Sequence, residues 1–558
     1  MMHSVCLRLA FAAVLVVSAA AAARADAKKF VAFAWEFSRM SVRDLSAYAD
    51  ELDKTPLDGI GIYLNEPTPD GGKVSTHNIM HVAWRRDVLV PLVPVARKLA
   101  AHKSMRESFI GTFRAPFGHR IEWNDDDGWA RVASNMIIAA WFAKTGGLRG
   151  ISMDPEDYHC TAQFVRQGGD EPYETLVAMA RRRGRQVFEG VFREYPDICI
   201  LSFWFLSMDH VYLGSERPER DARERGFLWP AFVDGILDVM PATARIVDGC
   251  EHSYRYESSR GDFYNAADAI RRRLPVMLSP ENRAKYQRQV NVSFGLYLDM
   301  FTNPEGSNWY FGPVNGSRLV HFERNLAQAA RAADEYVWFW GERHCWADWR
   351  GKGPEDSRNI SAETWNHAVP GLEDAIIAVK SPAEFAKMRG KAMKASGRFS
   401  PMNENSECRT ENGKVPQPYS TWQQKKNRQG RLYGDMACGE GDKHSLAAEG
   451  VENGSFSIGF GRHVTAGERF VVSLSMLGEG GSASVCWKRG SAWDWNICSP
   501  VQVRFGGQGN EGWRHGRAVV RVPEGVDGCG LIMSVRQGPM QKCWFDNVAI
   551  YSLGMPGD

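Results

Sequence analysis

The sequence predicts an α/β fold, a (β/α)8 barrel of the TIM type, followed by a smaller antiparallel β-sandwich. Three observations lead to this prediction. The 558-residue chain is too long for one ordinary domain. Short apolar runs alternate with longer amphipathic segments from residue 29 to about residue 350, and beyond about residue 400 the pattern changes to a strand period of two. We therefore predict a barrel over residues 26–380, a linker over 381–400 and a sandwich over 401–558.

Eight apolar runs of the first domain have the length and spacing of barrel strands. They are Phe30–Phe37, Gly59–Leu64, Ser108–Arg114, Gly150–Glu156, Ile198–Leu206, Ala244–Asp248, Val292–Asp299 and Tyr336–Glu342. Helical segments fall between them, among them Val42–Leu52, Trp129–Lys144 and Tyr173–Tyr195. Eight strands with intervening helices favour a closed barrel over an open sheet. No Gly-x-Gly-x-x-Gly turn follows the first run, so a dinucleotide-binding fold is not indicated.

The first 25 residues have the pattern of a signal peptide. Arg8 is followed by an apolar run from Leu9 to Ala23, and Ala23-Arg24-Ala25 forms a small-x-small cleavage site before Asp26. We therefore expect export to the periplasm or the outside after cleavage near Ala25. No later stretch approaches the roughly 20 apolar residues that a transmembrane helix needs.

The cysteines are distributed unevenly. Of eleven, one lies in the leader, four lie in the barrel region and six lie in the last third of the chain, at Cys408, Cys438, Cys486, Cys498, Cys529 and Cys543. Six cysteines in an exported β domain predict three disulfides, and hairpin positions favour the pairs Cys486–Cys498 and Cys529–Cys543. A zinc site is less favoured because no Cys-x-x-Cys pair occurs.

The charge balance and the aromatic content of the chain indicate which class of ligand it binds. The chain has 68 Lys and Arg against 66 Asp and Glu, and cleavage of the leader removes Arg8 and Arg24, so no nucleic-acid partner is indicated. Aromatic residues make up 11% of the chain, with 19 Trp. Flat apolar rings that stack on sugar faces are one explanation, and core packing is the other. The sequence does not indicate an oligomeric state.

The fourth run carries two carboxyl groups at its end. A period of two places Ser152, Asp154 and Glu156 on one face of Gly150-Ile-Ser-Met-Asp-Pro-Glu156. Chemistry in such barrels sits at the carboxyl ends of the strands. Because neighbouring like charges raise one another's pKa, one acid of such a pair can stay protonated and act as a general acid. We predict this role for Glu156, with Asp154 beside it. The alternative is that Asp154 or Asp157 caps the following loop.

A second catalytic carboxylate is expected from another strand, since glycoside hydrolysis uses one group to protonate the leaving oxygen and another as base or nucleophile. The sixth run ends in Asp248 and is followed by Glu251 and Tyr254, and the seventh ends in Tyr297 and Asp299. We prefer Glu251 as the second carboxylate, with Asp299 or Asp248 holding a sugar hydroxyl and Asp299 a further catalytic candidate. The alternative for Glu251 is a surface-loop acid.

Polar and aromatic residues at the other strand ends complete the predicted sugar-binding set. They are Trp35, Asn65, Arg114, Trp204, Tyr254, Tyr297, Trp338 and Trp340, and an aromatic mouth is extended by Trp309 and Tyr310. Glu342 follows the same last strand. Each single Trp can equally belong to the core.

The fourth run resembles the strand end of chitinase-like glycoside hydrolases, which carries the motif Asp-Gly-x-Asp-x-Asp-x-Glu. Gly150-Ile-Ser-Met-Asp-Pro-Glu156 matches its last part, while Arg149 and Ser152 stand where the motif has its first acids. The resemblance implies a glycosidase barrel with Glu156 as proton donor, Asp154 in support, and Trp338 or Trp340 as the floor of a sugar subsite. It does not imply a mechanism through an acetamido group.

The region from Tyr419 to Leu553 resembles family 4/9-like carbohydrate-binding modules. Thr421-Trp-Gln423 and the closing Phe545-Asp-Asn-Val548 carry the resemblance. It implies a jelly roll with a structural calcium near Asp546. Trp487, Trp493 and Trp495 are candidate sugar contacts, and an inert accessory domain is the alternative.

These patterns together predict an exported glycoside hydrolase that cleaves a poly- or oligosaccharide with paired carboxylates and needs no catalytic cofactor. A non-catalytic glycan-binding barrel, and a polysaccharide lyase or deacetylase, are the alternatives. The absence of a Gly-x-Ser-x-Gly motif argues against an esterase of the α/β-hydrolase type. The absence of a phosphate-loop motif argues against nucleotide hydrolysis.

Overall fold

The computed structural model describes residues 28–381 and 408–554 with short gaps, together with residue 385. The gaps are 115–118, 158–160, 209, 258–259, 315–316, 348–362, 409, 411, 425–428, 441–442, 461–462, 497 and 509–511. The chain divides into two compact units, one of Lys28–Ile376 and one that contains Ile377–Asp558. The predicted signal peptide and nearly all of the predicted linker lie outside the described residues.

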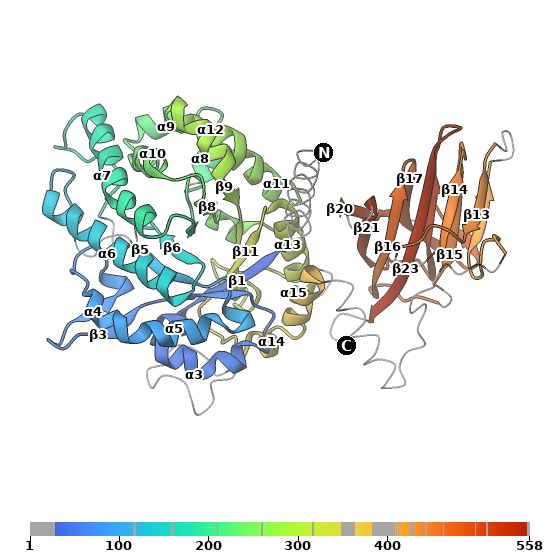
Figure 1. Cartoon of the computed structure of the whole chain (residues 1–558), viewed down its shortest axis with the longest axis horizontal. Helices are drawn as coiled ribbons and strands as arrows, with labels where there is room; N and C mark the ends of the chain where they lie inside the picture. Colours follow the sequence, from blue (N-terminus) through green and yellow to red (C-terminus); the bar gives the residue numbers. More distant parts are fainter. Residues whose placement is uncertain are drawn as a thin grey trace, which may run out of the picture. The chain divides into compact units, whose positions relative to one another are not determined.

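The first unit is built on one parallel sheet (Figure 1). Its strands are β1 (Lys29–Ala34), β2 (Gly59–Ile62), β5 (Phe109–Arg114), β6 (Gly150–Asp154), β7 (Cys199–Ser202), β8 (Arg245–Asp248), β9 (Val290–Val292), β10 (Phe294–Tyr297) and β11 (Tyr336–Gly341). The order is β10-β11-β1-β2-β5-β6-β7-β8-β9. Only Ser293 separates β9 from β10, so this split run brings the two ends of the sheet together. The predicted parallel α/β barrel is confirmed.

All eight predicted runs contain strands, but several end earlier than predicted. The chain leaves β1 at Ala34, and α2 (Trp35–Ser38) follows at once. The seventh strand is interrupted at Ser293, where the backbone N–H donates to the Asp248 carbonyl at 2.8 Å and the hydroxyl donates to the Tyr336 carbonyl at 2.8 Å. These bonds tie the broken strand to both neighbours.

Helices lie around the outside of the sheet (Figure 1). The longer ones are α3 (Val42–Leu52), α5 (Val93–Ala100), α6 (Asp126–Gly146), α7 (Tyr173–Glu194), α10 (Trp229–Val239), α11 (Arg260–Asp268), α12 (Pro280–Gln289), α13 (Arg318–Ala332) and α15 (Leu372–Lys380). The short ones are α4 (Arg86–Leu89), α8 (His210–Gly214), α9 (Pro218–Glu224) and α14 (Trp365–Ala368). A hairpin of β3 (Asn65–Pro67) and β4 (Lys73–Ser75) follows β2.

Short single turns and a π-helical turn complete the unit. The 3-10 turns are η1 (Thr76–Asn78), η2 (Val90–Leu92), η3 (Lys103–Met105), η4 (Glu251–Arg255), η6 (Leu274–Met277) and η7 (Leu298–Phe301), and η5 (Ala269–Arg273) is the π-helical one.

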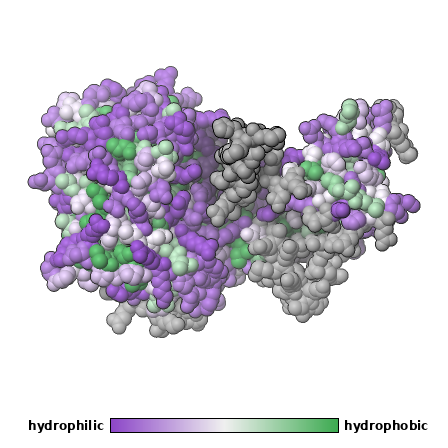
Figure 2. Space-filling model, viewed as in Figure 1, coloured by the Kyte–Doolittle hydropathy of each residue, from purple (hydrophilic) through white to green (hydrophobic). Residues whose placement is uncertain are grey.

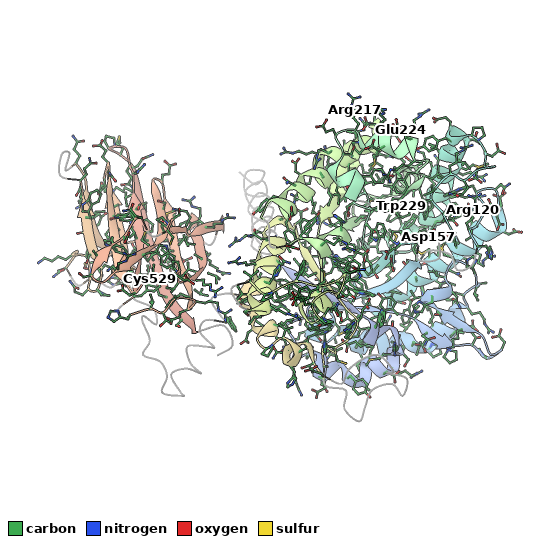
Figure 3. The ribbon with its side chains drawn as sticks, turned by 180° about the vertical axis from the view of Figure 1, so that it is seen from behind. Arg120, Asp157, Arg217, Glu224, Trp229 and Cys529 are labelled. Carbon is green, nitrogen blue, oxygen red and sulfur yellow. The ribbon has the colours of Figure 1, made fainter. Side chains whose placement is uncertain are left out.

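Local sequence accounts for the helices. α3 begins at a capping box in which the Ser41 side chain accepts the Asp44 N–H and the Asp44 side chain accepts the Ser41 N–H. It buries Val42, Leu45 and Ala49, the spacing of one helix face. The helix layer is itself packed with aromatic rings. Trp229 lies buried within it, whereas Arg217 and Glu224 lie at its edge (Figure 3).

The second unit consists of two antiparallel sheets. One contains β12 (Ser420–Gln423), β15 (Gly454–Gly459), β22 (Gly528–Val535), β17 (Gly481–Arg489), β18 (Ala492–Trp493) and β19 (Val501–Gln502). The other contains β13 (Arg431–Asp435), β14 (Ser445–Glu449), β23 (Lys542–Gly554), β16 (Arg469–Gly478), β21 (Arg514–Arg521) and β20 (Arg504–Gln508).

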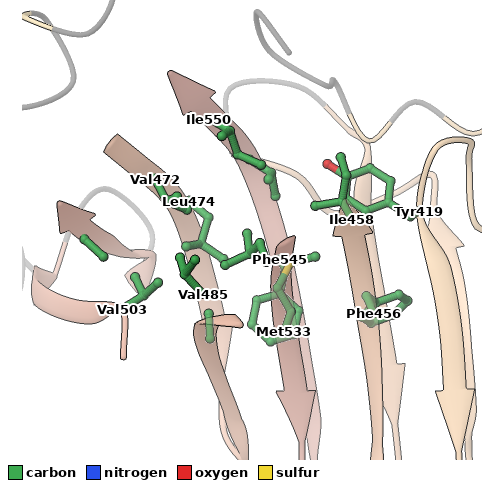
Figure 4. Close-up of a cluster of buried hydrophobic side chains, with 14 of the residues drawn as sticks. Tyr419, Phe456, Ile458, Val472, Leu474, Val485, Val503, Met533, Phe545 and Ile550 are labelled. Carbon is green, nitrogen blue, oxygen red and sulfur yellow. The ribbon is translucent and has the colours of Figure 1, made fainter. Parts of the chain in front are cut away.

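Both sheets contribute to one apolar core. Phe456 and Met533 come from the first sheet, and Leu474 and Phe545 come from the second (Figure 4). Alternate residues of each strand face this core, as the strand period predicted. The arrangement fits the predicted β-sandwich, and the jelly-roll topology stays a prediction.

No disulfide joins the cysteines that the structure describes, so the predicted disulfides are corrected. These cysteines are Cys199, Cys250, Cys345, Cys408, Cys438, Cys486, Cys498, Cys529 and Cys543. Cys486 lies between Val485 and Trp487 on β17, and both of these neighbours face the core. Cys486 therefore points to the opposite face of its sheet, while Cys498 packs against the core.

Cys529 and Cys543 both face the core but lie at opposite ends of it. Cys529 pairs with Trp487 on β17, whereas a Cβ at Gly481 would lie 3.4 Å from the Cys543 Sγ. Gly481 pairs with Val535, six residues along β22 from Cys529. Six strand residues span about 20 Å, which is far beyond the reach of a disulfide.

The surface of the Lys28–Ile376 unit is mostly hydrophilic on the face seen in Figure 2, with small hydrophobic areas between the charged side chains. Among the described residues, no helix combines the length and the apolar character that crossing a membrane requires.

Candidate active site

A cavity of about 490 Å³ opens at the carboxyl ends of the barrel strands. It is lined by Glu156, Trp204, Met208, Glu251, His252, Tyr254, Arg255, Tyr297, Asn303, Ser307, Trp309, Trp340, Glu342 and Arg343. These residues follow β6, β7, β8, β10 and β11, so segments far apart in the sequence meet there. This is the edge at which a barrel of this type places its chemistry.

A tight turn after β8 positions Glu251. The Gly249 N–H donates to the Ser202 carbonyl at 2.7 Å, and a Cβ at Gly249 would lie 2.7 Å from that oxygen, so only glycine fits. Cys250 then adopts a left-handed conformation with φ 44°. The Glu251 N–H donates to the Phe203 carbonyl at 3.0 Å. This turn directs Glu251 into the cavity at the start of η4.

The surroundings of the Glu251 carboxyl favour its protonated form. The residue is partly exposed, but its Oε2 atom is buried. Burial raises the pKa of Glu251 well above its ordinary value, and the charges of Glu156 and Asp154 raise it further. Tyr254 and Trp204 face the carboxyl and lower its pKa by smaller amounts. The three acids therefore lie close enough to affect one another's ionisation.

The end of β6 supplies the other two acids of this group. Asp154 is buried at the last position of the strand, and its Oδ1 accepts the Glu156 N–H at 3.3 Å. Glu156 is half-buried and lines the cavity. Asp157, labelled in Figure 3, caps the following loop, where it accepts the Thr161 and Ala162 N–H groups at 3.0 and 2.6 Å. The capping alternative is thus correct for Asp157.

Glu342 is a third glutamate in the cavity. Its Oε1 accepts the Trp340 indole N–H at 2.9 Å. Burial raises the pKa of the Tyr297 hydroxyl, and the charges of Asp299 and Glu342 add to this. Tyr297 therefore stays protonated and can donate a hydrogen bond into the cavity.

Asp299 lies behind the cavity wall and does not line the cavity. It is fully buried, and its Oδ2 accepts the Glu342 N–H at 2.8 Å. Burial raises the pKa of Asp299 to about 7, while the Glu342 N–H acts in the opposite direction. The predicted catalytic or hydroxyl-binding role of Asp299 is replaced by a positioning role for the segment that carries Glu342 and Arg343.

Asp248 and Trp338 belong to the barrel interior, contrary to the prediction that they contact sugar. Asp248 accepts the Leu206 and Ser207 N–H groups at 2.9 and 3.1 Å, and the Ser207 hydroxyl also donates to it. Its carboxylate therefore holds the loop after β7. Trp338 is fully buried and donates to the Gly249 carbonyl at 2.8 Å.

Three further predicted residues are not part of the described cavity lining. Trp35 opens α2 instead of extending β1. Asn65 opens the β3–β4 hairpin, where it pairs with Ser75. Arg114 ends β5, and its side chain lies outside what the structure describes. Of the predicted sites, the cavity contains Glu156, Glu251, Trp204, Tyr254, Tyr297 and Trp340.

The cavity also contains polar residues that the sequence reasoning did not assign to it. Arg255, Asn303 and Arg343 are the clearest cases. Arg255 follows Glu251 within one short turn, and Arg343 follows Glu342. Proximity to a predicted strand-end acid was the only signal available in the sequence.

The described surroundings of Asp546 do not by themselves form a calcium site. Its Oδ2 accepts the Glu440 N–H at 2.7 Å, and its Oδ1 accepts the Asn547 N–H at 2.7 Å. Among the described residues, no group of three or more His, Cys, Asp or Glu side chains could hold a metal ion. The residues next to Glu440 lie outside the described part, and the calcium near Asp546 stays a prediction.

Comparison with known proteins gives fold-level likeness alone. No family model and no curated protein matches the chain. The GH5_18 structure from Streptomyces cattleya in complex with GlcNAc is 12% identical over 64% of this chain and 81% of its own, with a TM-score of 0.36. The catalytic domain of the hyperthermophilic chitinase from Pyrococcus furiosus is 12% identical over 64% of this chain and 98% of its own, with a TM-score of 0.34.

The second unit has its own structural neighbours. The CBM22-1 xylan-binding domain of Paenibacillus barcinonensis Xyn10C is 13% identical over 28% of this chain and 96% of its own, with a TM-score of 0.21. A tailspike protein of bacteriophage CBA120 is matched over only 21% of its length. The solved structures similar to this chain thus include glycoside hydrolase and carbohydrate-binding domains.

Proposed function

We propose that this protein is an exported glycoside hydrolase that acts on a poly- or oligosaccharide. The observation that carries the proposal is the group of acids at the cavity, in which partial burial and the charges of Glu156 and Asp154 raise the pKa of Glu251. A protonated and an ionised carboxyl beside one cavity are the groups that glycoside hydrolysis needs. The leader pattern of residues 1–25 supports export.

The two glutamates exchange the roles that were expected from the sequence. Glu251 is the general acid, because burial and two neighbouring negative charges raise its pKa and favour its protonated form. Glu156 is the base or nucleophile, and the carboxylate of Asp154, which accepts the Glu156 N–H, positions it. The sequence-based choice of Glu156 as acid rested on its place at the strand end, which does not indicate burial.

Aromatic rings on the cavity wall support a sugar as the ligand. Trp204, Trp309 and Trp340 line the cavity, and the Tyr297 and Trp309 rings meet edge to face with centroids 5.4 Å apart. Such rings offer apolar faces to the C–H groups of a pyranose, while the nearby carboxyl, hydroxyl and amide groups bond its hydroxyls.

Reducing-sugar release across a polysaccharide panel tests the proposal. We expect the wild-type chain to release sugar from at least one member and Glu156→Gln to lower the rate about 10²-fold or more. Glu189→Gln is the matched control, since Glu189 is exposed on α7 and pairs with Arg193 at 3.3 Å. Equal rates for wild type and Glu156→Gln would remove Glu156 from the mechanism. Retention of a glycan without cleavage would favour a binding protein, and unsaturated products would favour a lyase.

We also propose that the second unit binds sugar through exposed tryptophans. The Trp493 and Trp495 rings stack with centroids 6.2 Å apart and 25° between their planes, and Trp495 is 59% exposed. We expect Trp495→Ala to weaken retention in affinity electrophoresis roughly tenfold. Met540→Ala is the control, because Met540 is an apolar side chain that is 95% exposed in the same unit. Equal retention of Trp495→Ala and wild type would favour an accessory domain.

A further inference from the structure

Two arginines stand in the cavity beside the acids. Arg255 is the last residue of η4, one turn after Glu251. Its guanidinium carbon lies 4.0 Å above the centre of the Trp309 ring, and within the described part of the chain no carboxylate pairs with it. Stacking on the ring fixes the position of the guanidinium while its N–H groups stay free to bond a ligand.

Arg343 approaches the same cavity from the segment after β11. Its side chain is 58% exposed, and its Nε lies 3.9 Å from the Asp299 Oδ1, at the outer limit of an ion pair. Burial raises the pKa of Asp299, which weakens its ionised form as a partner of Arg343. In the described structure no ion pair joins either arginine to Glu251 or Glu342.

A cavity that held only neutral sugar would not need two such cations. Their fork of N–H donors matches the paired oxygens of a carboxylate or a sulfate group. The cations are therefore explained best by a negative charge on the ligand.

We propose that Arg255 and Arg343 bind an anionic substituent, carboxylate or sulfate, of the saccharide. The glycan that this cavity accepts is then an acidic one. This inference rests on the proposed function for the identity of the ligand as a saccharide, but its test does not require hydrolysis.

Binding is measured by titration calorimetry in the Glu156→Gln background, which prevents turnover. The probes are oligosaccharides in matched sets, each a neutral backbone with its uronic acid counterpart and its sulfated counterpart. We expect at least one acidic member to bind tenfold or more tightly than its neutral partner and to lose affinity as salt rises. Preference within a set identifies the group as carboxylate, sulfate or either.

Substitution of the two arginines then tests whether they contact the anionic group. We expect Arg255→Gln and Arg343→Gln each to weaken binding of the acidic member about tenfold or more and to leave the neutral member within about twofold. The affinity of Arg255→Lys for the acidic member should fall between those of the wild-type residue and Arg255→Gln. Lysine keeps the positive charge but lacks the paired N–H donors of the guanidinium. Arg245→Gln is the control, since Arg245 is exposed at the amino end of β8, away from the cavity.

The outcomes separate this inference from the proposed function. If no acidic member binds more tightly than its neutral partner, or if the double arginine variant binds it as well as the parent, the inference is overturned. Cleavage of neutral glycans alone by the wild type would overturn it and leave the hydrolase intact. Arginine-dependent binding of an acidic glycan that the wild type never cleaves would support the inference and overturn the hydrolase.

Discussion

Glu251→Gln is expected to lower kcat for glycoside hydrolysis by about 10²- to 10⁴-fold. The amide has nearly the shape of the carboxyl but cannot transfer a proton to the leaving oxygen. Because Glu251 is held between Tyr254 and Trp204 by a turn that does not depend on its side chain, the variant should fold normally. The measurement is steady-state hydrolysis of the substrate found in the polysaccharide panel, with Glu189→Gln as the control.

Two further readouts distinguish an acid catalyst from a residue that only binds substrate. An aryl glycoside whose leaving group needs no proton should be cleaved by Glu251→Gln nearly as fast as by the wild type in the step that releases the aryl group. The pKa of Glu251 is raised, so wild-type activity should fall as pH increases through it, and the variant should lack this alkaline limb. Equal losses on both substrates, with an unchanged pH profile, would contradict the acid role.

Trp338→Ala is expected to destabilise the barrel unit by about 3–5 kcal/mol. The indole is fully buried inside the ring of strands, stacked on Phe203 at a centroid distance of 4.4 Å and edge to face with Phe33 at 5.7 Å. A Cβ at Gly249 or Gly295 would already lie within 3.0 Å of the indole, so the site cannot easily collapse around a smaller side chain. The truncation should leave a cavity and an unbonded Gly249 carbonyl.

Denaturant unfolding of the full chain, followed at the transition of the barrel unit, measures this loss. Val90→Ala is the control, because Val90 is 52% exposed in the same unit and should change the stability by no more than about 0.5 kcal/mol. A similar change in the free energy of unfolding in both variants would mean that Trp338 does not stabilise the core. In that case the predicted sugar-floor role of Trp338 would have to be reconsidered.

Strand and helix periods were readable from the sequence because they depend on neighbours only a few residues away. All eight apolar runs contain barrel strands, and α3 spans Val42–Leu52 as predicted. The carboxyl ends of those runs also pointed to Glu156 and Glu251, since parallel strands of one barrel must end on the same edge.

The local sequence pattern could not predict the ionisation state of these side chains or the residues that they contact. Burial and the charges of Glu156 and Asp154 raise the pKa of Glu251, and these residues lie almost 100 positions away in the chain. The two disulfides predicted from hairpin spacing, Cys486–Cys498 and Cys529–Cys543, were wrong for the same kind of reason. The spacing of a pair along the chain indicates neither the face of the sheet nor the end of the core to which each thiol points.

The sequence by itself determined the barrel, the two-sheet unit that follows it and the edge at which acids gather, because periodicity and turn residues act over short range. Only the tertiary structure decided which strand-end groups reach the cavity. Asp248 bonds a loop from β7, and Asp299 bonds the segment after β11. A buried polar group must find a partner wherever the fold supplies one, and those partners lie far away in the chain.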